Sequence, residues 1–324
     1  MIDVVMANFN HSKSMRDSIS ALNEQILRPQ QIIIVDDAST DDSLKVIREL
    51  QEKHTNIKVV QNTQNVGATN SYNIGLQHSK NQYIYFAAAD DQTYPQLFSR
   101  SVSALEDFQK AAFACSEVRI VDQTSRKKSN RPIIRPRIRN EYMNPIEVSR
   151  EFRSNDNWIM TGATVFRREL ISLLDGFDSG IDAFSDSILA KKLALRYGCA
   201  FLTFYGSEWH VSKDGLSRSA FLQDDLFYAM KERIQISIEN DGNFPPWYWN
   251  KYSKRLDFSR IRLTNEYRHV NSVPGSKAKI IRVMTNLIFE PQKFTSTLIA
   301  FIQKRPFSLF RYLATTVVRS FAQN

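Results

Sequence analysis

Two pairs of adjacent aspartates each follow an apolar run that is typical of a buried strand. Asp36-Asp37 comes directly after residues 32–35, and Asp90-Asp91 comes directly after residues 83–89. A carboxylate at the first position could accept hydrogen bonds from a nucleobase N–H or a ribose hydroxyl. Carboxylates at the second position suit a hard divalent cation, which prefers oxygen ligands and is commonly held by one or two protein carboxylates plus substrate phosphate oxygens.

Structural explanations cover part of this pattern. Ser39 to Asp42 are residue types that cap the first turn of a helix, and Asp90-Asp91 could belong to a turn that ends at Pro95. Capping explains residues 39–42, but it does not explain the two adjacent acids that precede them.

The elements around these residues alternate between short apolar runs and helical patterns. Strand-like runs at residues 2–6, 32–35, 57–60 and 83–87 are joined by segments with helical spacing. This order predicts an α/β fold with a mostly parallel sheet flanked by helices. Ligands of such sheets bind at the carboxyl ends of the strands, so residues 8–12, 36–41 and 88–94 are expected to converge on one crevice.

A polar and basic segment follows at residues 126–139, where Pro132 and Pro136 interrupt any helix. We expect a mobile loop there. It is either a solvated insertion or a place where Arg135, Arg137 and Arg139 meet phosphates or an acidic acceptor. Beyond it, the pattern predicts a strand at residues 164–166, a helix from Arg168, a turn at residues 175–178 and a helix from Asp186.

Four blocks in the first 100 residues, taken in order, resemble glycosyltransferase family 2, a family of inverting enzymes with the Rossmann-like GT-A fold. The blocks are residues 4–10, residues 33–41, Asn65-Val66-Gly67 with Asn73-Ile74-Gly75-Leu76, and residues 86–91. The last block resembles the metal-binding Asp-x-Asp sequence of the family. One departure is that the first acid of that sequence falls on Ala88, which leaves Asp90 as the second acid with Asp91 beside it.

The resemblance implies a nucleotide-sugar site in this half of the chain. Ala7 and Phe9 would line the nucleobase pocket, and Asp37 would contact the base, taken as uracil. Gly67 would let the backbone approach the nucleotide closely, because glycine has no Cβ. Asn73 belongs to the same set of nucleotide-binding candidates. Asp90 and Asp91 would hold Mg²⁺ or Mn²⁺ against the donor diphosphate.

A weaker resemblance continues through residues 161–168 and 176–178 to the helix that starts near Asp186, with Leu189, Leu193 and Tyr197 four residues apart. It implies that Asp186 is the base that deprotonates the acceptor hydroxyl. Asp182 is the rival base, and a structural alternative is that Asp186 only caps its helix. His210 lies in a block that resembles the end of the catalytic domain, where a histidine can approach the metal or the diphosphate, so it is a candidate metal ligand.

The predicted function is therefore inverting transfer from a nucleotide sugar, a UDP-sugar, to a hydroxyl of a saccharide or lipid-linked saccharide in surface-polysaccharide synthesis. Two alternatives stay open. The loss of an acid at Ala88 fits a catalytically impaired nucleotide-sugar-binding subunit, and the sequence pI of about 9.4 fits a basic nucleic-acid-binding protein. The second alternative leaves the ordered acidic blocks without a role, so no nucleic-acid partner is expected.

The net charge of +9 is concentrated near the C-terminus, because residues 250–324 contain 14 Lys and Arg against 3 Asp and Glu. We expect a catalytic domain at residues 1–217, with a nucleotide-binding half at 1–95 and an acceptor-side half at 96–217, followed by a basic helical region at 218–324. Apolar stripes between Phe294 and Phe321 predict amphipathic helices that bind an anionic membrane surface, pack on the domain or form a homodimer. Two cysteines, no apparent signal sequence and no long apolar stretch favour a cytoplasmic protein, peripheral on the inner face of the membrane.

Overall fold

The computed structural model describes residues 1–122, 128–211 and 216–272. The helices predicted between Phe294 and Phe321 lie outside the described residues. Within the described ranges, no helix is both long enough and apolar enough to span a bilayer.

The N-terminal half is a parallel α/β unit, as the sequence predicts. Four strands stand in the order β3-β2-β1-β4, and every neighbouring pair is parallel. Their bounds are β1 (Ile2–Asn8), β2 (Gln31–Asp36), β3 (Ile57–Gln61) and β4 (Tyr83–Ala88), and the crossover helices are α1 (Met15–Asn23), α2 (Ser43–Lys53) and α3 (Ala68–His78).

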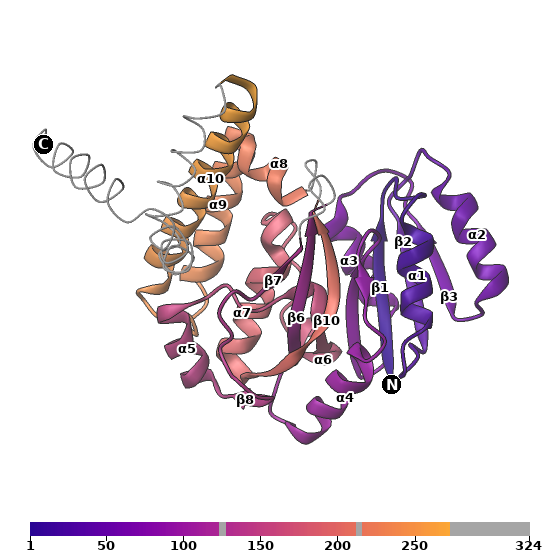
Figure 1. Ribbon diagram of the computed structural model, residues 1–324, viewed down its shortest axis with the longest axis horizontal. Coiled ribbons are helices and arrows are strands. Elements are labelled where there is room, and N and C mark those ends of the chain that lie inside the picture. The colour runs from indigo at the N-terminus through magenta and orange to yellow at the C-terminus, as the bar shows by residue number, and fades with distance from the viewer. Residues whose placement is uncertain (123–127, 212–215, 273–324) are drawn as a thin grey trace, which may run out of the picture. The chain divides into compact units, whose positions relative to one another are not determined.

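The second half extends the same sheet and makes it mixed (Figure 1). β9 (Thr164–Arg167) is antiparallel to both β4 and β6 (Phe113–Asp122), and β10 (Cys199–Val211) is parallel to β6. Because β9 is antiparallel to both of its neighbours, β4 and β6 run in the same direction. β4, β6 and β10 therefore all end at the same edge of the sheet. Short antiparallel strands complete it: β5 (Gln92–Thr93), β7 (Lys128–Arg131) and β8 (Glu141–Met143).

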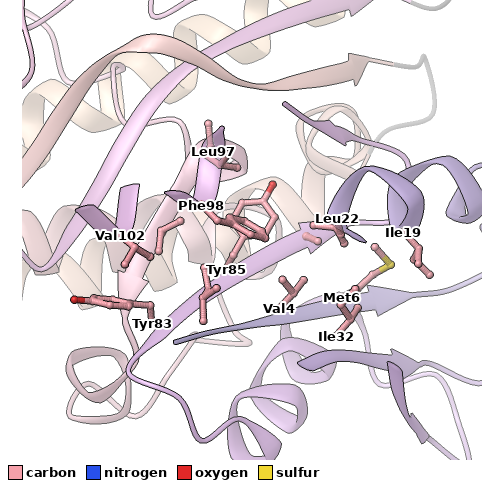
Figure 2. Close-up of a cluster of buried hydrophobic side chains, with 14 of the residues drawn as sticks. Val4, Met6, Ile19, Leu22, Ile32, Tyr83, Tyr85, Leu97, Phe98 and Val102 are labelled. Carbon is pink, nitrogen blue, oxygen red and sulfur yellow. The ribbon is translucent and has the colours of Figure 1, made fainter. Parts of the chain in front are cut away.

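Alternation along the central strands sends apolar side chains to both faces of the sheet. Val4 and Met6 of β1 pack with α1, α2 and α4 (Leu97–Asp107) in one buried cluster, and Figure 2 shows Tyr85 and Phe98 in the same cluster. Val5 faces the other side, against α3. A Cβ on Gly75 of α3 would lie 2.2 Å from a methyl carbon of Val5, so the glycine permits the close approach of helix and strand.

The remaining helices lie in the later part of the chain. They are α5 (Pro145–Ser154), α6 (Arg168–Ser172), α7 (Ser185–Tyr197), α8 (Leu216–Leu222), α9 (Asp224–Glu239) and α10 (Tyr248–Ser272), with 3₁₀ turns η1 (Thr161–Ala163) and η2 (Asp182–Phe184). The chain divides into two compact units, Met1–Ser253 and Lys254–Asn324, so α8 and α9 belong to the first unit. The predicted end of the catalytic domain at residue 217 stays a prediction.

Part of the basic segment predicted as a loop is a strand. Residues 128–131 pair with residues 118–121 of β6 as the antiparallel strand β7. Period-2 apolar alternation is absent from this stretch, so the sequence carried no signal for it.

Candidate active site

The two carboxylates of the first aspartate pair have different hydrogen-bond partners. Asp36 is fully buried and accepts hydrogen bonds from Asn8 Nδ2 at 2.8 Å and from the Ser39 hydroxyl at 2.7 Å. These bonds fix the ends of β1 and β2 against each other. Asp36 is therefore a structural residue of the crevice.

Asp37 fixes the loop that precedes α3. Its carboxylate accepts hydrogen bonds from Asn62 Nδ2 at 2.8 Å, from the Val66 N–H at 2.9 Å and from the Gly67 N–H at 2.8 Å. Gly67 has φ of +89°, a conformation that favours glycine. Asp37 and Gly67 thus act together, and the carboxylate is only 2% exposed. Its predicted contact with the nucleobase stays a prediction.

The residues predicted to line the base pocket lie at the carboxyl end of β1. Ala7 pairs with Val35 on one side and with Ala88 on the other, which places it between the two acidic segments. Phe9 follows the strand end and is 42% exposed, so its ring is open to solvent and to a ligand. Their assignment to the nucleobase stays a prediction.

The second aspartate pair meets His210 at the end of β10. The His210 N–H donates to Asp91 Oδ1 at 2.9 Å, and His210 Nδ1 lies 2.8 Å from the carbonyl oxygen of Asp90. His210 Nε2 lies 3.2 Å from Glu208 Oε1, and the Tyr94 hydroxyl donates to Glu208 Oε2 at 3.1 Å. Both ring nitrogens therefore already face oxygen acceptors, so direct metal ligation by His210 would require one of these contacts to break.

Asp91 and Asp90 differ in their surroundings. Burial, and then the neighbouring charge of Asp90, raise the pKa of Asp91 to about 7. Asp90 is half-buried, and within the described chain its carboxylate accepts no hydrogen bond. Both oxygens of Asp90 and the Oδ2 oxygen of Asp91 thus keep acceptor capacity.

These side chains can bind a divalent cation only if a substrate supplies further ligands. Within residues 1–122, 128–211 and 216–272, no group of three or more His, Cys, Asp and Glu side chains is placed to hold a metal. Two adjacent carboxylates do suit Mg²⁺ or Mn²⁺ when phosphate oxygens of a substrate supply further ligands. Asp90, with Asp91 behind it, would therefore bind the cation together with a diphosphate.

The candidate base Asp186 lies in the first turn of α7. Its carboxylate accepts hydrogen bonds from the Thr161 hydroxyl of η1 and from the Ser187 N–H at 2.6 Å. Burial raises the pKa of this carboxyl, and the hydrogen bonds from Thr161 and Ser187 only partly offset that effect. A raised pKa makes its carboxylate a stronger base than that of an exposed aspartate.

The rival base candidate, Asp182, lies in η2, directly before α7. It is exposed, has φ of +50°, and its backbone carbonyl and carboxylate face the Thr69 hydroxyl at 3.3 and 3.4 Å. These contacts tie η2 to α3.

Tyr72 of α3 packs against Phe86 and Phe177, and no motif in the sequence singled it out beyond its place in a helix. Its buried hydroxyl donates to the Ala87 carbonyl at 3.1 Å. Burial raises the pKa of this phenol, and the charges of Asp186, Asp91 and Asp90 raise it further. The two carboxylate sites come from both halves of the domain and meet at η1, where Thr161 donates to Asp186 and a Cβ on Gly162 would lie 3.9 Å from Asp91 Oδ2.

Asn73 joins α3 to the acceptor-side half of the domain. Its Nδ2 donates to the Phe177 carbonyl and its Oδ1 accepts from the Phe177 N–H, both at 2.8 Å. The amide thus joins α3 to the turn at residues 175–178. A nucleotide contact by Asn73 would have to break this pair, so that role stays a prediction.

Comparison with known proteins connects this geometry to one family. The family model described as "Glycosyl transferase family 2" matches residues 3–174. An uncharacterized glycosyltransferase of Haemophilus influenzae is 31% identical over 106 residues, which are 33% of this chain and 33% of the relative. The UDP-Glc:alpha-D-GlcNAc-diphosphoundecaprenol beta-1,3-glucosyltransferase WfaP of Escherichia coli is 27% identical over 106 residues, 33% of this chain and 41% of the relative. The match thus spans less than half the length of either relative.

Solved structures show the same architecture. TarS 1-349 of S. aureus in complex with UDP gives a TM-score of 0.57 at 14% identity, covering 88% of this chain and 78% of that chain. The mannosyltransferase PcManGT from Pyrobaculum calidifontis in complex with GDP-Man and Mn²⁺ gives 0.57 at 16% identity, covering 93% and 84%. At these identities the likeness concerns the fold, which is the predicted α/β GT-A fold.

Proposed function

Because the chain belongs to glycosyltransferase family 2, we propose that it moves a hexosyl or N-acetylhexosaminyl unit, with inversion, from a UDP-sugar to a hydroxyl of a saccharide or lipid-linked saccharide. The observation that carries the proposal is that η1 lies between the two carboxylate sites: the Thr161 hydroxyl donates to Asp186, and a Cβ on Gly162 would lie 3.9 Å from Asp91 Oδ2. The name of WfaP, with a UDP-sugar donor and a diphosphoundecaprenol-linked acceptor, and the UDP complex of TarS support the donor and the acceptor class. We assign the product to cell-surface polysaccharide and the enzyme to the cytoplasm.

The donor would lie across the ends of β1, β2 and β4. Asp37 holds the loop that ends at Gly67 and so shapes the nucleotide side of the crevice, and the open ring of Phe9 offers a stacking face for the base. Asp90 and Asp91 would hold Mg²⁺ or Mn²⁺, which neutralises the leaving diphosphate when bound. The Mn²⁺ in the PcManGT complex supports this cofactor class.

Asp186 would act on the acceptor. Its carboxylate removes the proton of the acceptor hydroxyl while that oxygen bonds to the anomeric carbon, and the bond from this carbon to the UDP oxygen breaks on the opposite side. The proton stays on Asp186 until solvent takes it, and UDP leaves with the bonding electron pair. Thr161 and Ser187 hold the carboxylate in place.

The test is to incubate the full chain with UDP-glucose, UDP-galactose, UDP-N-acetylglucosamine and GDP-mannose. Released nucleotide and thermal stabilisation are then measured with and without Mn²⁺. We expect a UDP-sugar to stabilise the fold and to be hydrolysed or transferred. Stabilisation with no turnover of any donor, even with saccharide acceptors, would instead support the impaired subunit that Ala88 favours. No response to any sugar nucleotide would overturn the proposal.

A further inference from the structure

Four exposed isoleucines lie close together in the sequence, three in the segment that follows β7 and one, Ile146, in the first turn of α5. The exposed fractions are 48% for Ile133, 42% for Ile134, 92% for Ile138 and 64% for Ile146. A soluble protein scatters exposed apolar side chains, and a concentration of them marks a contact surface. None of these residues belongs to the active site.

The segment that carries them is fixed to the domain by polar contacts. Arg135 forms an ion pair with the buried Glu117 of β6, and Asn155 Nδ2 donates to the Ile134 carbonyl at 3.1 Å. Arg137 lies 3.8 to 3.9 Å from carboxylates of Glu141, Glu147 and Glu151. These contacts run along α5, so the isoleucines project from an anchored ribbon. Arg135 and Arg137 thus contact carboxylates of the protein itself. The sequence had left open whether they meet phosphates or an acidic acceptor.

The charge around the isoleucines is positive. Residues 128–154 contain 7 Lys and Arg against 3 Asp and Glu. The Arg139 side chain is 80% exposed, and its guanidinium meets a carboxylate only at 3.7 Å, from Glu141. Aliphatic side chains mixed with arginines are the composition that enters the interface of an anionic bilayer.

We propose that the surface formed by Ile133, Ile134, Ile138, Ile146 and Arg139, here called the isoleucine ribbon, binds the headgroup interface of an anionic lipid bilayer. Charge complementarity selects the bilayer, because the aliphatic residues bury in the interface while arginines meet lipid phosphates. The ribbon lies apart from the active site. Arg135 pairs with Glu117 in the middle of β6, and β8, which lies between Ile138 and Ile146 in the chain, pairs with residues 199–201 at the start of β10, whereas His210 lies near the end of that strand.

The experiment measures vesicle binding by the full chain without any sugar nucleotide, so its result is independent of the proposed activity. Wild-type protein is floated with phosphatidylcholine vesicles that contain or lack phosphatidylglycerol, at low and high salt. We expect binding only to the anionic vesicles and weaker binding at high salt. The triple variant Ile133→Ser, Ile134→Ser, Ile138→Ser should bind at least tenfold more weakly. Arg139→Ser should bind roughly fivefold more weakly.

The matched control replaces three equally exposed apolar residues from other elements, Ile26→Ser, Leu173→Ser and Ile236→Ser, with exposed fractions of 72%, 69% and 43%. It should bind like wild type, and all variants should keep the wild-type thermal midpoint because no changed side chain is buried. Two results would overturn the proposal: no wild-type binding to anionic vesicles, or equal binding by the ribbon and control variants. The second result would include the case in which another part of the chain alone carries the binding.

Discussion

Replacing Asp186 by Asn removes the basic group and keeps the contacts that position the side chain. The amide keeps an acceptor for the Ser187 N–H, and the Thr161 hydroxyl can turn to accept from the new amide group. The variant loses no packing contact, but it has no basic carboxylate. A positioned base contributes about a hundred- to ten-thousand-fold, so transfer should fall by that factor, equivalent to about 3–5 kcal/mol of activation free energy. UDP affinity, measured by calorimetry, should change little.

Stability should respond in the opposite direction. Burial raises the pKa of Asp186 from its ordinary 3.8, so the folded protein binds this proton more tightly than the unfolded chain. The contribution of Asp186 to the free energy of unfolding therefore falls as pH rises through the raised pKa, and at neutral pH the charged form costs stability. Asp186→Asn removes that cost, so its thermal midpoint at pH 7 should equal or exceed that of wild type. Wild-type transfer should decline on the acid side at a pH above the ordinary aspartate range.

Asp182→Asn is the matched control, because Asp182 is exposed and asparagine tolerates its positive φ. It should retain transfer within a few-fold of wild type. The reasoning fails if Asp182→Asn loses transfer while Asp186→Asn keeps it, or if Asp186→Asn is inactive only because it has unfolded.

Three further outcomes are expected. Asp90→Ala should lower transfer at least tenfold and raise the Mg²⁺ or Mn²⁺ concentration that gives half-maximal activity, and full turnover in excess EDTA would exclude the metal. Asp37→Ala removes the acceptor of the Val66 N–H and one of the two acceptors of the Gly67 N–H, so denaturant titration should show a loss of about 1–3 kcal/mol and UDP binding should weaken; unchanged stability would contradict this role. A chain that ends at Ser272 should sediment less with anionic vesicles than the full chain, and equal sedimentation would leave the C-terminal region as a packing or dimerisation element.

Local patterns in the sequence were sufficient to predict the parallel half of the fold. Strands at residues 2–6, 32–35, 57–60 and 83–87 were recognised because each is an apolar run with a helical segment after it, and all four are present. β7 was missed because its pairing with β6 depends on main-chain hydrogen bonds, which residues of any polarity can form. The antiparallel insertion of β9 between β4 and β6 also has no local signal, since strand order is set by tertiary packing.

The candidate site shows a similar division. Asp37, Asp90 and Asp186 could be selected from motif and position, and all lie at the carboxyl edge of the sheet or at the helix start beside it. The contacts that hold them could not be selected: Thr161 reaches Asp186 across 25 residues, and Gly67 reaches Asp37 across 30. Such partners are set by the approach of separate elements.

The block Asn73-Ile74-Gly75 fixes the position of α3 within the domain. Gly75 lets α3 approach Val5 of β1, and Asn73 ties the same helix to Phe177 in the acceptor-side half. Between them in space, Tyr72 packs its ring against Phe86 and Phe177 and donates its hydroxyl to the Ala87 carbonyl. A shift of α3 would therefore move the Tyr72 hydroxyl relative to Asp90, Asp91 and Asp186 together. α3 is thus packed both against the end of β4, which leads to Asp90 and Asp91, and against the turn at residues 175–178, which precedes Asp186.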